Sequence, residues 1–595
     1  MTRSARICIG ILGLLCLMVG GAVWYGRSPH PVNVLLITLD TTRADRLGCY
    51  GYSHGRTPTL DGLARQGVLF QRAYAPAPLT LPSHATMLTG LYPPEHGLHN
   101  NGQAALPKGL PTLATELQAA GYETGAFVAA FVLDRKFGLQ RGFDTYDDDL
   151  SQADPSLQGH HQYRDGRLVV DAALRWLRPR SHKPYFCWVH LFDPHYPYLA
   201  HEDQYGTEFK DRPYDAELAY VDDQIERLLS TLQRTGALDN TMIVVVGDHG
   251  ESLGEHGELA HGMTIYDATL RVPLLIVPPG DTRPAHRVSE PVSLVDLTPT
   301  LLHRLGRKPL SNVSGRSLDA ALRGEPLTPV PCYAETDEPY HTAHWSPLRA
   351  LITPQWKYIR SPRAELYDLL ADPAELRNLA TESPEQLKKL EEELAAWERR
   401  MDQRLASNVA LSEQERQTLN SLGYSSRRDS SGEAERPLRD VKDMLPYYYK
   451  LNDAAAMIDA GRHDLAEPVL REVLAGDDEY FEAHGELGRC LLRQKRLPEA
   501  VQSLRRAMEL NPGADKVQSM LGATLLLQKD YPAAVDALEV AIRLNPDLHQ
   551  NYFNLGMALE KLGKTDEAIK QYGECLEREP GAAQALQRLE ALRKR

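Results

Sequence analysis

The chain has 595 residues, too many for a single hydrophobic core, so we expect two or more domains. Its formal net charge of -14, with no basic stretch interleaved with aromatic residues, argues against nucleic acid as a partner. The seven cysteines are scattered without a CxxC pair, which argues against a zinc ribbon or a disulfide scaffold.

The N-terminus contains a predicted membrane segment. Residues 1–6 include Arg3 and Arg6, and the following run Ile7–Gly26 is uncharged, mostly apolar and long enough to cross a bilayer as a helix. We expect a transmembrane signal anchor over residues 7–26, with everything after it on the extracytoplasmic side. A cleaved signal peptide is the alternative, although the run is long for one and no small-x-small site follows it.

Three apolar segments further along the chain each lead into polar side chains. Continuous apolar strands of this kind are buried on both faces, as in a parallel sheet covered by helices. Ligands of open α/β sheets bind at the carboxyl edge of the strands, so we expect these polar side chains to meet there. The segments are Val32–Leu39 before Asp40, Pro184–Leu191 before Asp193 and His195, and Thr241–Gly247 before Asp248 and His249.

Thr80 lies between a predicted strand, Gly67–Tyr74, and a predicted helix that has Pro82 in its first turn. This places Thr80 at or just before a helix N-terminus, where backbone N–H groups and the helix dipole favour an anion. Taken alone, such a threonine is more often a simple helix cap than a nucleophile. The nucleophile hypothesis depends on the carboxylates and imidazole predicted at the same edge.

We predict that Asp40, Thr80, Asp248 and His249 hold one divalent cation and that Thr80 is the nucleophile. The cation would lower the pKa of the hydroxyl and neutralise a non-bridging oxygen of an anionic ester. Carboxylates with one imidazole suit Ca²⁺, Mg²⁺, Mn²⁺ or Zn²⁺. Imidazoles can bind the charged oxygens of the ester or protonate its leaving group, and the histidines predicted to do so are His84, His195 and His261.

Residues 32 to about 400 resemble a sulfatase of the alkaline phosphatase superfamily. The resemblance implies a mixed sheet sandwiched by helices over a catalytic domain of residues 27–400. It makes Asp40, Asp248 and His249 metal ligands and puts Thr80 at the nucleophile position. It also puts His84 at the Arg near the metal and substrate, His195 at the substrate-binding His and His261 near the substrate-binding Lys. The matching stretches are Asn33–Gly51, Pro82–Gly97, Phe192–Pro197, Gly247–Gly257, Tyr266–Leu274, Ser293–Leu302 and Glu365–Glu375.

The chain departs from the sulfatase pattern at the nucleophile. Sulfatases convert a Cys or Ser at this position into formylglycine, and the side chain of Thr80 cannot give that aldehyde. A sulfated threonine would have no second hydroxyl to expel the sulfate, whereas a phosphorylated threonine can be released by water or an alcohol. The segment Thr80–His84 also resembles the Thr-x-Pro-x-His segment of nucleotide pyrophosphatase/phosphodiesterases, which use Thr in this way.

A second departure follows Gly121–Gly125. Many sulfatases continue there with a Lys-Trp-His group that binds sulfate, but this chain has Ala126–Lys136 instead. Arg135 or Lys136 could serve a charged head group in its place. We therefore predict a metal-dependent hydrolase or transferase of phosphate-containing esters, acting through a covalent intermediate on Thr80. The alternatives are a sulfuric ester hydrolase and an inactive sulfatase-like platform for the C-terminal segment.

The C-terminal segment repeats with a period of 34 residues, seen in the pairs Leu487-Gly488, Leu521-Gly522 and Leu555-Gly556. This period, with small residues at helix crossings, is typical of tetratricopeptide repeats, which form an all-α solenoid. After a predicted helix over Ser383–Met401, we assign residues 401–446 to a linker, 447–580 to four repeats and 581–595 to a capping helix. The concave surface of such a solenoid commonly binds a peptide or protein, and a spacer or dimerisation role is the alternative.

Overall fold

The computed structural model describes residues 31–151, 164–178, 183–280, 284–412, 415–416, 418–419 and 437–593. The predicted signal anchor, 7–26, and much of the predicted linker lie outside these residues. Among the helices within them, none combines the length and the apolar content that crossing a bilayer requires. The described cysteines are buried thiols without disulfides: Cys49, Cys187, Cys332, Cys490 and Cys575.

A nine-stranded sheet forms the centre of the larger domain, in the order β10-β2-β8-β7-β1-β6-β4-β5 with β9 beside β2. Its strands pair in parallel except for β8, which is antiparallel to both β2 and β7, so the sheet is mixed, as the resemblance implied. The strands are β1 (Asn33–Leu39), β2 (Val68–Tyr74), β4 (Glu123–Phe127), β5 (Thr145–Asp147), β6 (Tyr185–Leu191), β7 (Thr241–Gly247), β8 (Arg271–Val277), β9 (His286–Val288) and β10 (Val292–Ser293).

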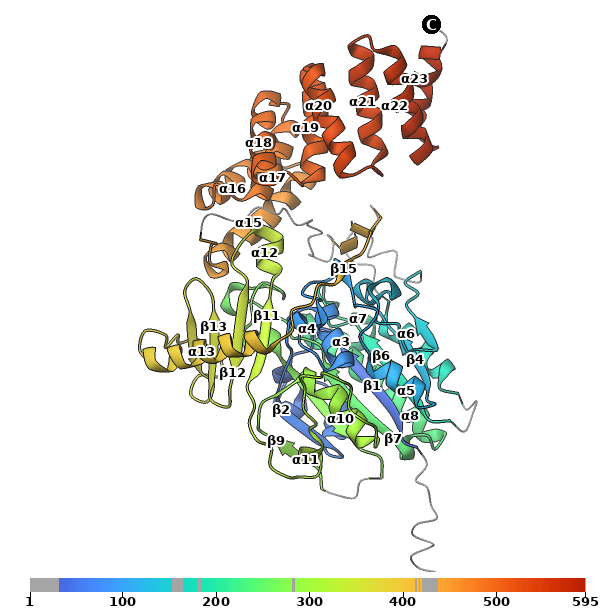
Figure 1. The fold of residues 1–595 in the computed structure, drawn as a ribbon, viewed down its shortest axis with the longest axis vertical. Coiled ribbons are helices and arrows are strands. Elements are labelled where there is room, and N and C mark those ends of the chain that lie inside the picture. Colours follow the sequence, from blue (N-terminus) through green and yellow to red (C-terminus); the bar gives the residue numbers. More distant parts are fainter. Residues whose placement is uncertain are drawn as a thin grey trace, which may run out of the picture.

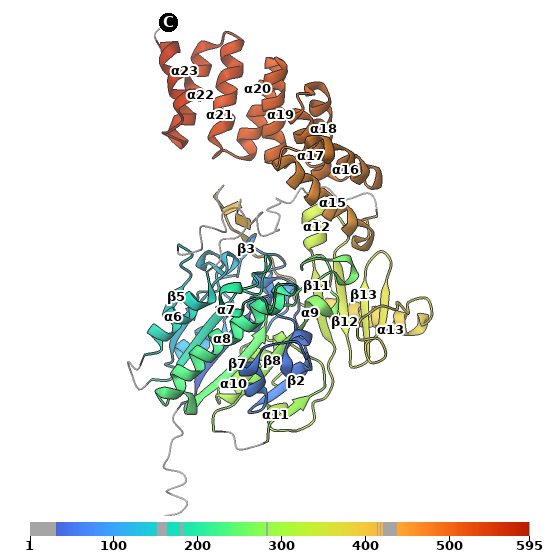
Figure 2. The ribbon, with the colours of Figure 1, turned by 180° about the vertical axis from the view of Figure 1, so that it is seen from behind.

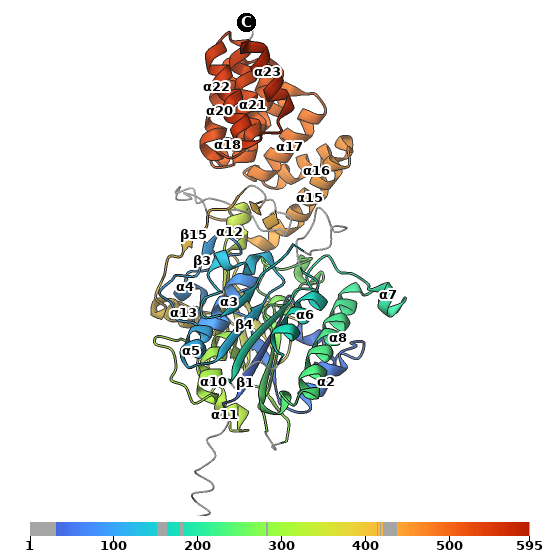
Figure 3. The same ribbon diagram turned by 90° about the vertical axis from the view of Figure 1, so that its right-hand side faces the viewer.

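Helices cover both faces of this sheet, which explains why its central strands are continuously apolar (Figure 3). Helices α3 (Thr80–Thr89), α5 (Leu113–Ala119) and α10 (Leu297–Arg304) cover one face. Helices α2 (Pro58–Ala64), α6 (Gly166–Trp176) and α8 (Pro213–Arg234) cover the other, which faces the viewer in Figure 2. The shorter helices of this domain are α4 (Pro93–His96), α7 (Glu202–Tyr205), α9 (Asp267–Leu270) and α11 (Asp319–Leu322).

The register of the central strands brings their carboxyl ends to one level. Leu39, the last residue of β1, pairs with Leu191 of β6 and with Gly247 of β7. The ladder continues one step further, because the Asp40 amide donates to the Leu191 carbonyl at 2.9 Å and the Asp248 amide donates to the Leu39 carbonyl at 3.2 Å. The residues that follow these three strands therefore share one edge of the sheet.

A smaller antiparallel sheet extends the larger domain. It consists of β11 (Cys332–Thr336), β12 (Leu348–Ile352), β13 (Trp356–Arg360) and β14 (Glu365–Asp368), and α12 (Glu338–Ala343) follows β11. Helix α13 (Pro384–Arg400) packs on this sheet and matches the helix predicted over Ser383–Met401. A two-stranded ribbon joins β3 (Ala104–Ala105) and β15 (Ser407–Asn408).

The C-terminal helices form a solenoid that rises from the end of the larger domain where the carboxyl edge of the sheet lies (Figure 1). Close approach of paired helices requires glycine at positions such as Gly488 and Gly522, where a Cβ would lie 2.5 Å and 2.6 Å from the side chains of Leu504 and Leu538. The helices are α15 (Val441–Asp459), α16 (His463–Gly476), α17 (Phe481–Arg493), α18 (Leu497–Leu510), α19 (Asp515–Gln528), α20 (Tyr531–Leu544), α21 (His549–Lys561), α22 (Thr565–Arg578) and α23 (Ala583–Arg593).

The first repeats share their hydrophobic core with the larger domain. One continuous cluster of buried side chains runs from the central sheet into α15, α16 and α17 and reaches Ala500 in α18. A separate cluster, from Val501 to Leu592, holds the distal helices. The near half of the solenoid is therefore built onto the larger domain, whereas the far half has a core of its own.

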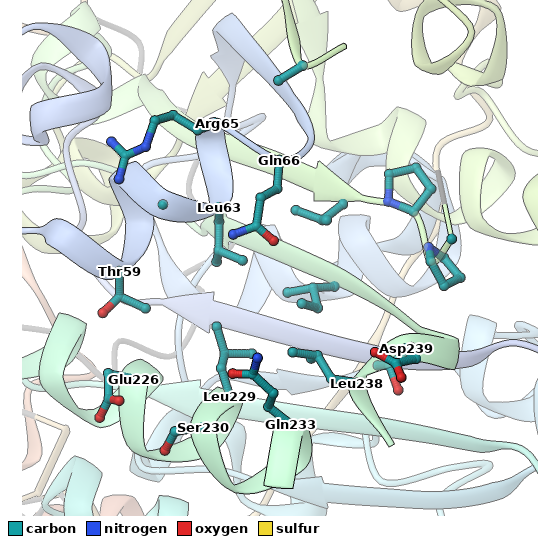
Figure 4. Close-up of a pocket in the computed structure, with 18 of the residues that line it drawn as sticks. Thr59, Leu63, Arg65, Gln66, Glu226, Leu229, Ser230, Gln233, Leu238 and Asp239 are labelled. Atoms are coloured by element: carbon teal, nitrogen blue, oxygen red, sulfur yellow. The ribbon is translucent and has the colours of Figure 1, made fainter. Parts of the chain in front are cut away.

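A cleft of about 880 Å³ opens at the amino end of β7, away from the carboxyl edge (Figure 4). Helix α2 contributes Thr59 and Leu63 to its lining, and α8 contributes Glu226, Leu229 and Gln233. None of the predicted site residues lines this cleft.

Candidate active site

Three side chains that could bind a metal ion lie together at the carboxyl edge of the sheet: Asp40, Asp248 and His249. His249 Nε2 lies 3.6 Å from Asp248 Oδ2 and 3.9 Å from Asp40 Oδ1. Both carboxylate oxygens are buried and have no hydrogen-bond partner. Such orphaned acceptors are costly unless something else satisfies them, and these three ligand atoms lie within 4.8 Å of one another.

The tautomer of His249 follows from its surroundings. Its Nδ1 is 3.0 Å from the Gly250 carbonyl, which can only accept, so Nδ1 carries the proton and Nε2 presents a lone pair. Burial, together with the charge of His261, holds the pKa of His249 well below its usual value. A neutral imidazole and two carboxylates that direct lone pairs to one point are the donor set that a divalent cation needs.

The two carboxylates are electrostatically strained without a cation. Burial raises the pKa of Asp40 to about 7. Burial, followed by the charge of Asp40, raises the pKa of Asp248 well above its usual range. A bound cation would reverse both effects by favouring the ionised forms.

Thr80 lies beside this cluster. It is the first residue of α3 and is fully buried. Its Oγ1 is 3.4 Å from Asp40 Oδ2 and 3.3 Å from His249 Nε2. The four predicted metal-site residues, which come from three separate segments, are therefore adjacent in the fold, with the threonine oxygen next to the lone-pair cluster.

Asn101 is a buried polar residue beside the start of α3 that the sequence did not indicate. Its Oδ1 accepts a hydrogen bond from the backbone N–H of Leu81 at 2.8 Å. This N–H is one of the free backbone donors in the first turn of α3, and the next residue, Pro82, has no N–H to donate. This bond fixes the side-chain amide, and its Nδ2 is buried without a hydrogen-bond partner. The amide next to Thr80 therefore keeps an unused donor, which suits a charge that develops on an anionic ester.

His84 lies one turn after Thr80 on α3, and both of its ring nitrogens have protein partners. Nδ1 donates to the Thr80 carbonyl at 2.8 Å, so Nε2 accepts from the Thr38 hydroxyl at 3.0 Å. The Trp188 indole donates in turn to Thr38 Oγ1 at 2.9 Å. Burial, followed by the charge of His190, lowers the pKa of His84 to about 3. The substrate contact predicted for His84 would require one of these bonds to break.

His190 is a second residue that the sequence analysis missed. It lies in β6, its Nδ1 accepts the Ala129 amide at 3.3 Å, and its Nε2 therefore donates to Asp40 Oδ2 at 3.1 Å. It orients the carboxylate that faces Thr80 and fixes which oxygen is left for a cation. The available signal was a histidine inside an otherwise apolar, buried strand.

His195 and His261 lie next to one another, with His261 beside the metal-ligand histidine. Their ring centroids are 5.0 Å apart, and the ring of His261 lies 4.5 Å from that of His249. Burial opposes protonation of His261, but the charge and the 3.0 Å hydrogen bond of Glu251 outweigh it and raise the pKa of His261. The site thus combines neutral imidazoles near the carboxylates with one imidazole that favours its cationic form.

The two cations proposed for a head group are engaged elsewhere. Arg135 forms an ion pair with Asp148, and Lys136 is bound to Glu415 and lies over the ring of Phe131. Either residue could contact a substrate head group only after its ion pair breaks.

Comparison with known families and proteins gives the following matches. Residues 32–307 match the Sulfatase family model, and residues 254–402 match that of the N-sulphoglucosamine sulphohydrolase C-terminal region. Tetratricopeptide repeat models match residues 457–524 and 549–582. Delta 4,5-hexuronate-2-O-sulfatase of Bacteroides thetaiotaomicron is 25% identical over 424 residues, which cover 60% of this chain and 85% of that protein. Choline-sulfatase of Rhizobium meliloti is 26% identical over 438 residues, covering 58% and 82%.

Solved structures share the fold. A phosphonate monoester hydrolase of Agrobacterium radiobacter superimposes with a TM-score of 0.53 at 22% identity, covering 62% of this chain and 96% of its own. A 2-O GAG sulfatase gives a TM-score of 0.54 at 22% identity, covering 68% and 99%.

Proposed function

We propose that this chain, which carries a sulfatase-family hydrolase domain followed by tetratricopeptide repeats, uses Thr80 and one divalent cation to cleave or transfer phosphate-containing esters. The observation that carries the proposal is the convergence of Asp40 Oδ1, Asp248 Oδ2 and His249 Nε2 beside Thr80 Oγ1. A buried set of lone pairs next to a hydroxyl has no structural purpose of its own, whereas it suits a metal-activated nucleophile.

The roles of the residues follow from their placement. A cation held by Asp40, Asp248 and His249 would lower the pKa of the Thr80 hydroxyl and neutralise a non-bridging oxygen of the ester. Thr80 Oγ1 bonds to phosphorus as the ester bond breaks, and its own proton passes to Asp40 Oδ2, 3.4 Å away. The proton of the His261 imidazolium passes to the departing oxygen. Attack of water or an acceptor alcohol on phosphothreonine releases the phosphoryl group and restores the hydroxyl. Asn101 Nδ2 supplies a donor for the developing charge.

Sulfate esters are the second candidate substrate. The curated relatives named above are sulfatases, and the family match covers the segment that contains all the site residues. Thr80 argues for phosphate, because a threonine sulfate ester has no internal hydroxyl with which to expel the sulfate. An inactive platform is the third candidate, and the retained lone-pair cluster argues against it.

The test measures hydrolysis of a bis-aryl phosphodiester, an aryl phosphate and an aryl sulfate by the wild-type chain and by Thr80→Ala. Each assay is run with a chelator and after return of Ca²⁺, Mg²⁺, Mn²⁺ or Zn²⁺. We expect phosphate-ester cleavage that the chelator abolishes and that Thr80→Ala reduces at least a hundredfold, on the scale of losing a covalent nucleophile. Acid quenching followed by peptide mass spectrometry should place the transferred group on Thr80.

Thr89→Ala is the matched control, since Thr89 lies on the same helix and its hydroxyl bonds only the Ala85 carbonyl and the Leu91 amide among described contacts. It should retain activity. Faster cleavage of the aryl sulfate would favour the sulfatase alternative. Activity that survives both the chelator and Thr80→Ala would rule out this mechanism.

We infer that the predicted anchor, residues 7–26, holds the catalytic and repeat domains on the extracytoplasmic side of a membrane. We also infer that the concave face of the repeats binds a peptide or protein. Fractionation of membranes and protease accessibility of the intact chain test the first. Pull-down with the full-length chain, compared with a chain ending at residue 510, tests the second.

A further inference from the structure

The loop of residues 251–263 brings one wall of the active site into place. It begins at Glu251 and ends just after His261, and the hydrogen bond between these two side chains closes it. Backbone hydrogen bonds of 2.7 Å from Ser252 to Ala260 and of 2.9 Å from Gly254 to Glu258 make it compact. A shift of this loop would therefore move His261 as well.

The inner side of the loop faces the nucleophile. A Cβ on Gly262 would lie 3.5 Å from the Leu79 side chain, and Leu79 immediately precedes Thr80. Arg43 donates to the Glu251 carbonyl at 3.1 Å and pairs with Glu255 at 2.7 Å. The loop is thus tied to the residues that follow β1 and packs against the start of α3.

The outer side of the loop is held by the first repeat helix. The Leu259 amide, two residues before His261, donates to the Tyr449 hydroxyl of α15 at 2.7 Å. A second connection runs from Lys442 of α15 through Glu365 at 2.8 Å to the Tyr266 hydroxyl at 2.7 Å. The ring of Tyr266 stacks on His256, within the loop, with centroids 3.6 Å apart.

Helix α15 is itself fixed to the larger domain and can act as a rigid support. Its N-cap, Asp440, accepts the Arg363 amide at 3.1 Å. The indole of Trp345, 1% exposed, lies against Tyr448 and Tyr480 with ring centroids 6.5 Å and 5.3 Å apart. The shared core described above joins the helix to the sheet. In Figures 1–3, α15 lies at the junction of the two parts of the molecule.

We propose that Tyr449, a residue of the repeat segment, is a positioning residue for the reaction: its hydroxyl holds the 251–263 loop and, through it, sets the place of His261 beside His249. The catalytic unit then extends into the first repeat helix and does not end with the sulfatase-like domain. The expected effect of Tyr449 on kcat rests on the proposed function. Its effect on the 251–263 loop can be measured without a substrate.

The experiment compares Tyr449→Phe with Tyr447→Phe in the full-length chain. Both changes remove one hydroxyl from the same helix, but Tyr447 packs on Gly476 of α16, where a Cβ would lie 2.6 Å from the Tyr447 hydroxyl. Hydrogen exchange with mass spectrometry follows the loop amides, and kcat and KM are measured on the best phosphate-ester probe. Loss of one hydrogen bond, worth about 1 kcal/mol, should speed exchange of the Leu259 amide in Tyr449→Phe about fivefold.

We expect kcat to fall about three- to tenfold in Tyr449→Phe with a smaller change in KM, because His261 acts on the leaving group, while Tyr447→Phe matches the wild type in both assays. Unchanged exchange of the Leu259 amide in Tyr449→Phe overturns the inference. Faster exchange with unchanged kcat also overturns it, since the hydrogen bond would then be only structural. If the wild-type chain cleaves no probe, the proposed function fails, and the exchange comparison alone decides whether Tyr449 holds the loop.

Discussion

The pair of buried carboxylates gives a direct test of the metal site at the level of single residues. Asp248 Oδ1 accepts the amides of Thr41 and His249, whereas Oδ2 has no partner. An asparagine can keep the first two bonds and lacks the charge, so Asp248→Asn should stabilise the chelated protein by relieving repulsion with Asp40. It should also weaken cation binding.

Thermal unfolding with and without cation measures both effects. At a hundredfold excess over Kd, a cation should stabilise the wild type by about 2.7 kcal/mol, and this gain should largely disappear in Asp248→Asn. Equal stabilisation of the two proteins by every cation tried would contradict the assigned ligand set.

Asp193 gives a pH-dependent prediction outside the metal cluster. Burial, followed by the charges of Glu217 and Asp165, raises its pKa to about 8, and its Oδ1 accepts the Gly166 amide at 2.9 Å. The folded chain therefore keeps a proton that the unfolded chain loses above its ordinary pKa of 3.8. Between pH 3.8 and about 8, unfolding therefore releases this proton. The contribution of Asp193 to the free energy of unfolding is fully present below pH 3.8 and is lost as the pH rises toward 8.

Asp193→Asn cannot titrate, so its free energy of unfolding should rise relative to that of the wild type by about 1.4 kcal/mol for each pH unit between pH 5 and pH 7. Urea unfolding at several pH values measures the difference. A difference in free energy of unfolding between the two proteins that stays constant from pH 5 to pH 7 would show that Asp193 is ionised in the folded protein.

Single residues also mark where sequence analysis reached its limit. Asp40, Asp248 and His249 could be predicted because each follows an apolar strand, and parallel strands end at one edge. His190 and Asn101 could not, because no periodicity tells which atom a buried polar side chain contacts across the fold. His84 was correctly placed on the helix of Thr80, but its partners Thr38 and Trp188 come from two other strands.

At the scale of elements, two helical glycines have opposite expected effects on replacement. Gly522 in α19 lies against α20, where a Cβ would approach the Leu538 side chain to 2.6 Å. Gly522→Ala should therefore destabilise the distal repeats by about 1–3 kcal/mol through overpacking. Gly573 in α22 would place a Cβ in open space, so Gly573→Ala should stabilise them by up to about 1 kcal/mol through helix propensity.

Circular dichroism of the two variants during denaturant unfolding separates these effects, since the distal helices have their own core and should report a transition of their own. Equal stability of the two variants would contradict the packing argument.

The sequence pattern predicted the helices and strands better than it predicted the contacts between them. The predicted strands before Asp40, Asp193 and Asp248 are β1, β6 and β7, and the 34-residue period corresponds to paired helices. The contact between Leu259 and Tyr449 joins two elements far apart in the sequence, and neither residue stands out in its own segment. Local periodicity specifies which face of a helix is buried but not which neighbour covers it.

For the whole molecule, the shared core predicts where the chain can be shortened. A chain ending at residue 436 would uncover the side chains that α15 to α17 cover, including Trp345. It should aggregate or lose thermal stability, since large exposed apolar patches promote association. A chain ending at residue 510, after α18, should remain soluble with a melting temperature near that of the larger domain.

Size-exclusion chromatography and differential scanning calorimetry compare the two shortened chains with the full-length protein. A stable monomer ending at residue 436 would contradict the continuity of the core. The comparison needs no assumption about substrate or metal.

The division between the two cores also limits how such a protein can diversify. Duplication or loss of units at the far end changes the length of the array, yet leaves intact every side chain that α15 to α17 place against the catalytic fold. The far half of the array can therefore change in length without altering the packing around the central sheet. Units next to the enzyme have no such freedom, because each change there is also a change to the enzyme.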